Sequence, residues 1–293
     1  MSEPKPPNRL KQNASYVRSV GSKILGKRSG KIGVAILVII LGFVLVGTFV
    51  IPYSPTDSSG PAYSAPSSSH IFGTDYIGRD VASMIVWGAY PSMFVSLLAS
   101  LGAVVIGLVV GVFSGYYRRA EGVLTGSADV VMTFPAFPLM ILLGMLYTPT
   151  NTTITLILIV VLWAPVSRAI RSQVLSVKER PFVEAAIVSG RRNLEIIARV
   201  IIPEVATIAI AYFVLMLSVS LVFVTGLEFL GVGNLEAISW GTILYWAQQF
   251  AFYNGSWWWI LAPGLFITLF ATGFALLGFS VEEVMNPRLR AGA

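Results

Sequence analysis

The sequence contains no cysteine, a single histidine and few charged residues. The absence of cysteine excludes disulfides, thiolate nucleophiles and cysteine-ligated metals. One histidine, His70, leaves little material for a histidine-based metal site or for general acid–base catalysis. Charged residues make up only 12% of the chain, whereas a soluble domain holds about 25%. These shortages argue against a soluble enzyme, and we expect neither a catalytic nor a metal site.

Long apolar runs are what the sequence has in abundance. Hydrophobic residues make up 55% of the 293 residues, and the mean hydropathy is +0.77. An uncharged apolar run of 18 or more residues is typical of a transmembrane helix. Such runs occupy residues 32–52, 81–117, 130–167, 205–227 and 237–281. The chain is therefore predicted to cross a membrane several times.

Three of these runs are too long for one helix each. At 1.5 Å per residue, 81–117 would span about 55 Å, so we place a helix start at Pro91. This gives a short surface helix at 81–90 before the second span. A turn-rich stretch at 148–153 separates the third span from the fourth, and Pro135 and Pro138 predict a kink or break in the third. The tryptophans at 257–259 resemble an interfacial belt before the sixth span. The predicted fold is an all-α membrane protein with six transmembrane helices; those with assigned bounds are 32–52, 92–116, 202–225 and 258–280.

The basic residues indicate how these helices are oriented. If both termini lie in the cytoplasm, every lysine and arginine except Arg79 falls on the inside, as the positive-inside rule requires. A basic tail precedes the first apolar run, which we interpret as a permanent helix and not as a cleaved signal peptide. The expected organisation is a cytoplasmic tail (1–31), a first helix (32–52), an external loop with a short surface helix (53–90), a five-helix core (91–281) and a cytoplasmic tail (282–293).

One cytoplasmic segment, residues 183–205, is unusually polar for this chain. Its apolar residues recur every three or four positions, which marks one face of a helix. Such a helix could lie flat on the membrane, or it could dock against another protein. Alanine and glycine on the apolar face favour docking, because they bury little area in lipid but allow close approach. Gly190 is costly in mid-helix and is expected at a turn between two short helices.

Several motifs give this segment a family resemblance. Glu184, Ala185 and Ala186, then Gly190, then Pro203 at the end of VIIP resemble the EAA loop of prokaryotic ABC import permeases. Seven further stretches resemble the dipeptide/oligopeptide class, C-type transmembrane subunit: HIFGTDYIGRDV (70–81), LEFLGVG (227–233), SWG (239–241), WWW (257–259), PGL (263–265), LLG (276–278) and NPRLR (286–290). Two departures are Asn286 in place of aspartate and NLEA (234–237) in place of a proline-rich turn.

The resemblance implies a function for the polar segment. In this family the EAA loop forms coupling helices that sit in a groove of a cytoplasmic ATPase. Glu184, Ala185, Ala186 and Gly190 would form this joint, and Pro203 would end it where the fifth span begins. Arg191 and Arg192 are candidate ATPase contacts, or are charges that set topology and meet lipid headgroups.

The resemblance also implies partners and cargo. The chain would pair with a second homologous permease subunit, two ABC ATPase subunits and an external solute-binding protein in the plasma membrane of a prokaryote. Family members usually import di- or oligopeptides, and some import oligosaccharides or nickel. ATP and Mg²⁺ would bind the ATPases: GSKILGKR (21–28) nearly matches a phosphate-binding loop, but Arg28 stands where a magnesium-binding hydroxyl is needed. No nucleic-acid partner is expected, because the basic residues are explained by topology.

Three other features stand out, and two of them leave alternatives open. Gly73, Thr74, Asp75, Gly78, Arg79 and Asp80 form either a turn followed by a helix cap or a contact surface for a binding protein. Gly107, Gly111 and Gly115 have the spacing of a helix-packing face. Asp129, expected at shallow depth near the start of the third span, could line a pathway, cap a helix or form a salt bridge.

Two other classes of membrane protein are weighed against the importer. A channel or secondary transporter acting alone would need inverted repeats or charges at mid-membrane, and the sequence shows no clear sign of either. A membrane enzyme would need clustered histidine, aspartate or glutamate, or a nucleophile beside a base. One histidine and no cysteine argue against an enzyme.

Overall fold

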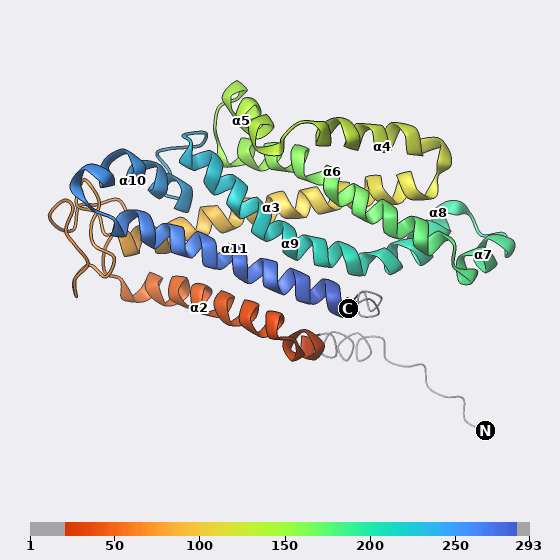
Figure 1. Ribbon diagram of the computed structural model, residues 1–293, viewed down its shortest axis with the longest axis horizontal. Coiled ribbons are helices and arrows are strands. Elements are labelled where there is room, and N and C mark those ends of the chain that lie inside the picture. Colours follow the sequence, from red (N-terminus) through yellow and green to blue (C-terminus); the bar gives the residue numbers. More distant parts are fainter. Residues whose placement is uncertain (1–20, 286–293) are drawn as a thin grey trace.

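A computed structural model of the chain describes residues 21–285, and these residues form a bundle of long helices (Figure 1). The parts of the predicted tails at 1–20 and 286–293, with the NPRLR motif, lie outside the described residues. Residues 21–285 contain no β-strand, only an isolated bridge between Thr74 and Asp80. The elements are α2 (Arg28–Val50), α3 (Val81–Tyr116), α4 (Arg118–Thr133), α5 (Ala136–Leu146), α6 (Asn151–Lys178), α7 (Pro181–Val188), α8 (Asn193–Ile196), the π-helix η1 (Ile197–Ile201), α9 (Ile202–Phe229), α10 (Trp240–Asn254) and α11 (Trp258–Met285).

The described helices confirm the prediction of an all-α protein that crosses the membrane several times. Five of them are long and apolar enough to span: α2, α3, α6, the continuous helix from α8 to α9, and α11. The pair α4 and α5 makes a sixth span if it is counted as one bent element. The predicted number of six is reached on that count.

The third span is broken where prolines were expected to break it. The axes of α4 and α5 differ by 87°. Phe134, between the two helices, is extended with φ −83° and ψ 138°, as the residue before a proline prefers. The N–H of Leu139 then donates to the carbonyl of Pro135, which starts the new helix. The helix of this span begins at Arg118, before its apolar run, because the polar first turns of α4 are also helical.

The helix boundary placed at Pro91 is wrong. Residues 81–90 are not a separate surface helix, because α3 continues through the proline for 36 residues. Proline removes only one hydrogen bond of the helix, and in a membrane protein the neighbouring helices can hold the backbone in place. Here Val81, Ile85 and Ala89 are fully buried, and the indole of Trp240 donates to the Ile85 carbonyl. Tertiary packing therefore stabilises the helix that the local sequence would interrupt.

The bundle is built around α3. It packs most extensively against α6 and also against α9, while α11 packs against α9 and α2 (Figure 1). The start of α2 and the end of α11 lie side by side, joined by an ion pair of Lys27 with Glu283. We call the end of the bundle where α7 and α8 project the α7 end, and the opposite end, with α10 and the loop of residues 51–80, the loop end.

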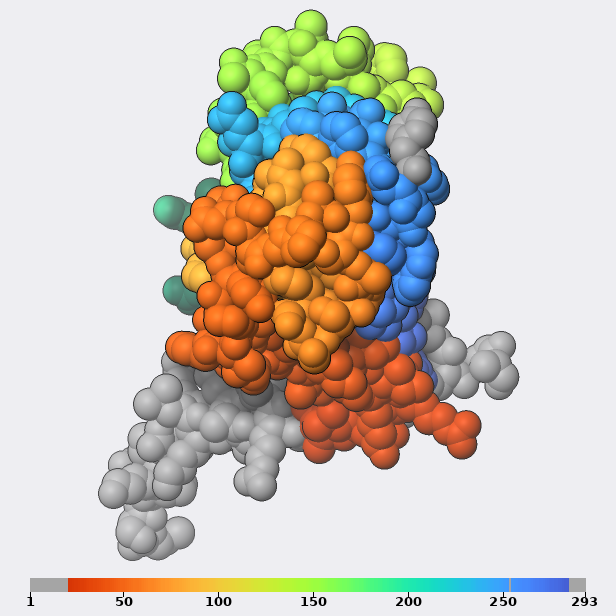
Figure 2. All heavy atoms as spheres, turned by 90° about the vertical axis from the view of Figure 1, so that its left-hand side faces the viewer, coloured from red at the N-terminus to blue at the C-terminus, as the bar shows by residue number. Residues whose placement is uncertain are grey.

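The loop end is a folded surface. Viewed from that end, residues of the 51–80 loop cover the middle of the bundle, with α10 and the start of α11 beside them and α5 at one margin (Figure 2). Beneath this surface Tyr76 stacks on Phe250 at 4.6 Å and on Trp259 at 5.6 Å between ring centroids. The loop is thus pinned to α10 and α11 by aromatic contacts.

Candidate functional site

The polar segment of residues 181–196 folds into two short helices that project at the α7 end (Figure 1). Pro181 takes the first position of α7, where its missing N–H costs nothing. Gly190 ends the helix with φ +73°, a left-handed conformation that glycine adopts without strain. The N–H groups of Gly190 and Arg191 donate to the carbonyls of Ile187 and Ala186, the pattern of a Schellman motif. Gly190 therefore lies in the turn between two short helices.

The residues that the EAA resemblance singles out lie mainly on the outer surface of this turn. Glu184, Ala185, Gly190, Arg191 and Arg192 are exposed, and Ala186 is half-buried. Among the described residues none pairs with the side chain of Glu184, Arg191 or Arg192 through an ion pair. These charges are free to meet another molecule.

Apolar side chains accompany these charges on the exposed surface. They belong to Phe182, Ile187, Val188 and Leu194, and Val188 is 83% exposed. In contrast Val183 is fully buried and anchors α7 to the bundle. An exposed cluster of large apolar residues beside unpaired charges is typical of a protein-binding surface.

Polar contacts tie α8 to α3, the residue before α7 to α9, and α6 to α3 beside them. The hydroxyl of Tyr116, at the end of α3, donates a 3.1 Å hydrogen bond to Oδ1 of Asn193 at the start of α8. Lys178, the last residue of α6, donates to the Tyr116 carbonyl at 2.8 Å. Arg180 pairs with Glu204 of α9 at 3.1 Å. A displacement of α7 and α8 would therefore be transmitted to α3, α6 and α9.

Pro203 lies in the first turn of α9, where the sequence placed the end of the polar segment and the start of the fifth span, but it does not interrupt the helix. Helical structure runs without interruption from Asn193 to Phe229, and residues 197–201 form a π-helix just before the proline. In the wide π turn the N–H of Ile202 donates to the carbonyl of Ile197, five residues back. The turn lies where proline offers no N–H, so it accommodates the missing bond. The helices α8, η1 and α9 therefore form one continuous helix, and α7 is separated from it by the turn at Gly190.

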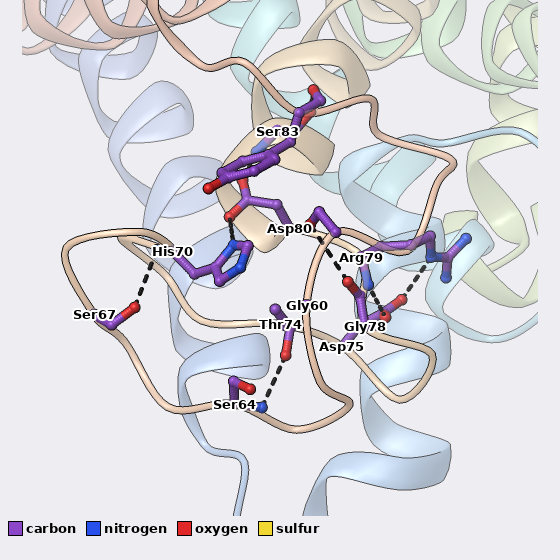
Figure 3. Close-up of polar contacts among 12 residues, drawn as sticks. Gly60, Ser64, Ser67, His70, Thr74, Asp75, Gly78, Arg79, Asp80 and Ser83 are labelled. Carbon is purple, nitrogen blue, oxygen red and sulfur yellow. Dashed lines mark hydrogen bonds and ion pairs between the residues drawn. The ribbon is translucent and has the colours of Figure 1, made fainter.

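The external-loop motif forms a network of buried polar groups (Figure 3). Asp75 is fully buried, accepts hydrogen bonds from the N–H groups of Ile77 and Arg79, and pairs with the Arg79 side chain at 2.6 Å. Asp80 caps α3 by accepting from the Ser83 N–H at 2.7 Å, and it contacts Nδ1 of buried His70 at 2.8 Å. These contacts match a turn followed by a helix cap.

The remaining members of that motif fit the loop closely. Gly73 and Gly78 have φ values of +68° and +85°, and a Cβ at either position would lie 2.5 Å or less from a backbone oxygen. The hydroxyl of Thr74, fully buried, donates to the Pro61 carbonyl and accepts from the Ser64 N–H. The motif therefore shapes the loop from within.

The glycine triplet of α3 lies against α6. A Cβ added to Gly107 would lie 2.7 Å from Val166, one at Gly111 would lie 2.7 Å from Ile170, and one at Gly115 would lie 2.8 Å from Val174. Each successive glycine meets a β-branched residue one turn further along α6. The absence of side chains at these positions lets the two helices approach closely, as the spacing predicted.

A charged region lies between α4 and α6, where Asp129 forms a salt bridge, one of its sequence alternatives, with a partner that the sequence did not name. Arg168 and Arg171 were assigned to a loop by the inside-charge count, but both lie within α6. Arg168 pairs with Asp129 at 2.5 Å, and Arg171 pairs with Glu121. Asp129 is also deeper in its helix than expected, because α4 begins at Arg118. The sequence shows two acidic residues in the segment of α4 and two arginines in the segment of α6. It does not show which of them pair, because that depends on how the two helices pack.

Comparison with known proteins places the chain in a family. Residues 103–291 match the family described as binding-protein-dependent transport system inner membrane component. The dipeptide transport system permease protein DppC of Alkalihalophilus pseudofirmus is 30% identical over 90% of this chain and 88% of its own length. DppC of Bacillus subtilis is 29% identical over 94% and 87%, and the oligopeptide transport system permease protein OppC of Haemophilus influenzae is 30% identical over 87% and 83%. With its several membrane-spanning helices, the chain belongs to the family of inner membrane components of binding-protein-dependent transport systems and is a multi-pass protein of the plasma membrane.

Proposed function

We propose that this chain is the transmembrane permease subunit of an ATP-driven ABC importer and forms half of a pathway for di- or oligopeptides. The observation that carries the proposal is the α7 surface, where unpaired Glu184, Arg191 and Arg192 adjoin exposed Phe182, Ile187 and Val188. A surface of this kind suits a groove on another protein better than a membrane surface, because its apolar area is small and broken by charges of both signs. The protein that carries this groove is a cytoplasmic ATPase.

The proposal fixes the orientation of the bundle. The α7 end is cytoplasmic, since it carries Arg118, Arg119, Arg180, Arg191 and Arg192. The loop end is external and carries Arg79, whose charge is neutralised by Asp75. A solute-binding protein delivers cargo to the loop end, and the external-loop motif shapes the surface that it meets.

The transport cycle needs further subunits. Two ATPases bind ATP and Mg²⁺, so the nucleotide chemistry is theirs and this chain is not catalytic. Closure of the ATPase pair moves α7 and α8. The continuous helix from α8 to α9 carries that movement to α9. The hydrogen bonds of Tyr116 and Lys178 carry it to α3 and α6. A second, homologous permease subunit supplies the other half of the pathway.

Peptides are the proposed cargo because relatives along nearly the whole chain carry the names dipeptide or oligopeptide permease. Oligosaccharides and nickel are the competing cargoes. Uptake by membrane vesicles holding the assembled transporter, its binding protein and ATP distinguishes them when labelled dipeptide, trisaccharide and Ni²⁺ are supplied in turn.

The joint with the ATPase is tested by charge reversal. Affinity purification of the tagged chain from its native membrane, followed by mass spectrometry, should recover an ATPase pair and a second permease. Glu184→Arg should weaken recovery of the ATPases, because it reverses an exposed charge in the first turn of α7. The matched control is Glu236→Arg, the same change on an exposed residue at the loop end. Equal ATPase recovery with both variants would sink the assignment of the joint.

A further inference from the structure

Two ion pairs connect α4 with α6, Arg168 with Asp129 and Arg171 with Glu121. Asp129 is about 16 Å along α4 from its start at Arg118, and Arg168 is about 15 Å along α6 from its end at Lys178. Both distances run from the α7 end, so the pair lies several turns inside α4 and α6 and not at their ends. The second pair, Arg171 with Glu121, lies nearer the α7 end.

The Arg168–Asp129 pair is not enclosed by its own chain. The side chains of Arg168 and Asp129 are 56% and 53% exposed. Charged groups within a membrane-spanning helix rarely face lipid and instead face protein or a water-filled cavity. This surface of α4 and α6 therefore borders a space that is not lipid.

A cavity opens beside the pair. Its volume is about 260 Å³, and it lies between α3, α4 and α6. The polar residues lining it are Ser114, Thr125, Asp129, Ser167, Arg168 and Arg171. The hydroxyl of Thr125 and Nε of Arg171 are buried and have no hydrogen-bond partner among the described residues. Buried polar atoms without partners are costly, so this region has unused donors that a bound group could satisfy.

We propose that this cavity binds the terminal carboxylate of a peptide in transit, with Arg168 as the principal contact. The inference rests on the proposed function and deepens it. The guanidinium matches a carboxylate in shape and offers paired donors, while Thr125 and Arg171 supply further ones.

Exchange of partners makes the subsite reversible. Because the Arg168–Asp129 pair is half exposed, its partners are held weakly, and a cargo carboxylate can replace Asp129 without leaving a buried charge unpaired. When the carboxylate departs, Asp129 reclaims the guanidinium. A binding site within a translocation pathway must both bind its cargo and release it.

Uptake of paired cargoes tests the assignment in the assembled transporter. Arg168→Gln should lower uptake of a dipeptide with a free carboxylate about tenfold, the effect of losing one charge-assisted hydrogen bond. Uptake of the same dipeptide as its C-terminal amide should change by less than about twofold. Lys27→Gln, which breaks the ion pair of α2 with α11, is the matched control and should affect neither cargo. An equal loss for both cargoes in Arg168→Gln would make the pair purely structural and overturn the proposal.

Thiol labelling gives a readout that does not depend on transport. Because the chain has no cysteine, Thr125→Cys places a single thiol in the cavity. A water-soluble thiol reagent should label it in native membranes, and the free-carboxylate dipeptide, but not its amide, should slow the labelling. Val160→Cys, on the exposed apolar surface of α6, should stay unlabelled.

The two experiments separate failure of the subsite from failure of the function. If the unaltered transporter takes up neither peptide form, the proposed peptide function falls, and the cargo assignment falls with it. If it transports peptides but Thr125→Cys is never labelled, the cavity is sealed and the subsite alone is wrong.

Discussion

The hydroxyl of Tyr116 lies 3.1 Å from Oδ1 of Asn193, and this hydrogen bond joins the end of α3 to the start of α8. The two residues are 77 positions apart in sequence. The bond connects the helix that forms the centre of the bundle with the segment proposed to receive movement from the ATPase. It is thus a specific point at which coupling can be weakened without removing either surface.

Tyr116→Phe should weaken this coupling. Removing the hydroxyl costs about 1 kcal/mol, the usual net value of a hydrogen bond, and leaves the ring in place. We expect a severalfold drop in cargo-stimulated ATP hydrolysis by the assembled transporter, with ATPase recovery unchanged. Asn193→Ala should have a similar effect, and the double variant should be no worse than either single one. Additive losses would show that the two side chains act independently.

Replacing a glycine of α3 should disrupt its packing against α6. Gly111→Val would place side-chain atoms against Ile170 and the Ser167 carbonyl, both 2.7 Å from the position of an added Cβ, and overpacking of this kind costs about 1–3 kcal/mol. The thermal midpoint of the purified transporter should fall. The control is Gly122→Ala on α4, where nothing lies within 4 Å and the better helix former should be neutral or stabilising. Equal effects at both positions would contradict close packing.

Asp80→Ala should destabilise the loop end by more than the loss of a helix cap. The cap to the Ser83 N–H contributes about 1 kcal/mol, and the substitution also leaves His70 buried without its partner. We expect a loss of about 2–3 kcal/mol, measured as the shift of a denaturation midpoint. Asp80→Asn, which keeps an oxygen for the cap, should lose less. His70→Ala and Asp80→Ala should be non-additive, and simple additivity would exclude the buried pair as a unit.

Substitutions at Gly190 can separate backbone strain from contact with a partner. No atom lies within 4 Å of a Cβ at this position, so the chain itself has room for a side chain. Asparagine tolerates the left-handed conformation, whereas valine is strained there by at least about 1–2 kcal/mol. If only the turn matters, Gly190→Asn should retain ATPase recovery and Gly190→Val should lose it. Loss of recovery in both variants would place the partner's surface directly over residue 190.

Much of the architecture follows from local patterns in the sequence. The apolar runs that predict α2 and α11 are long enough to form a helix wherever water is excluded, because only internal hydrogen bonds can satisfy the backbone there. The break at Pro135 is likewise local, since proline both removes an N–H and forces the preceding residue to be extended. The turn at Gly190 is of the same kind.

Other features were decided by neighbours that are distant in sequence. Pro91 was expected to start a helix, but α3 runs through it because α10 packs against the preceding turns. At Pro91 a local preference worth a few kcal/mol is outweighed by packing that spreads over many residues. Pro203 lies at the start of α9, as the sequence placed it, but the π-helix before it was not expected.

The sequence by itself determined the number of spans, the expected orientation and the segment proposed to meet the ATPase, because hydropathy, charge count and helical spacing depend only on residue order. Tertiary structure alone decided that Arg168 meets Asp129, that Tyr116 meets Asn193, and that a cavity lies between α3, α4 and α6. These contacts join residues 39 and 77 positions apart. Their pairing depends on how the helices rotate and slide against one another, and side-chain packing fixes that arrangement.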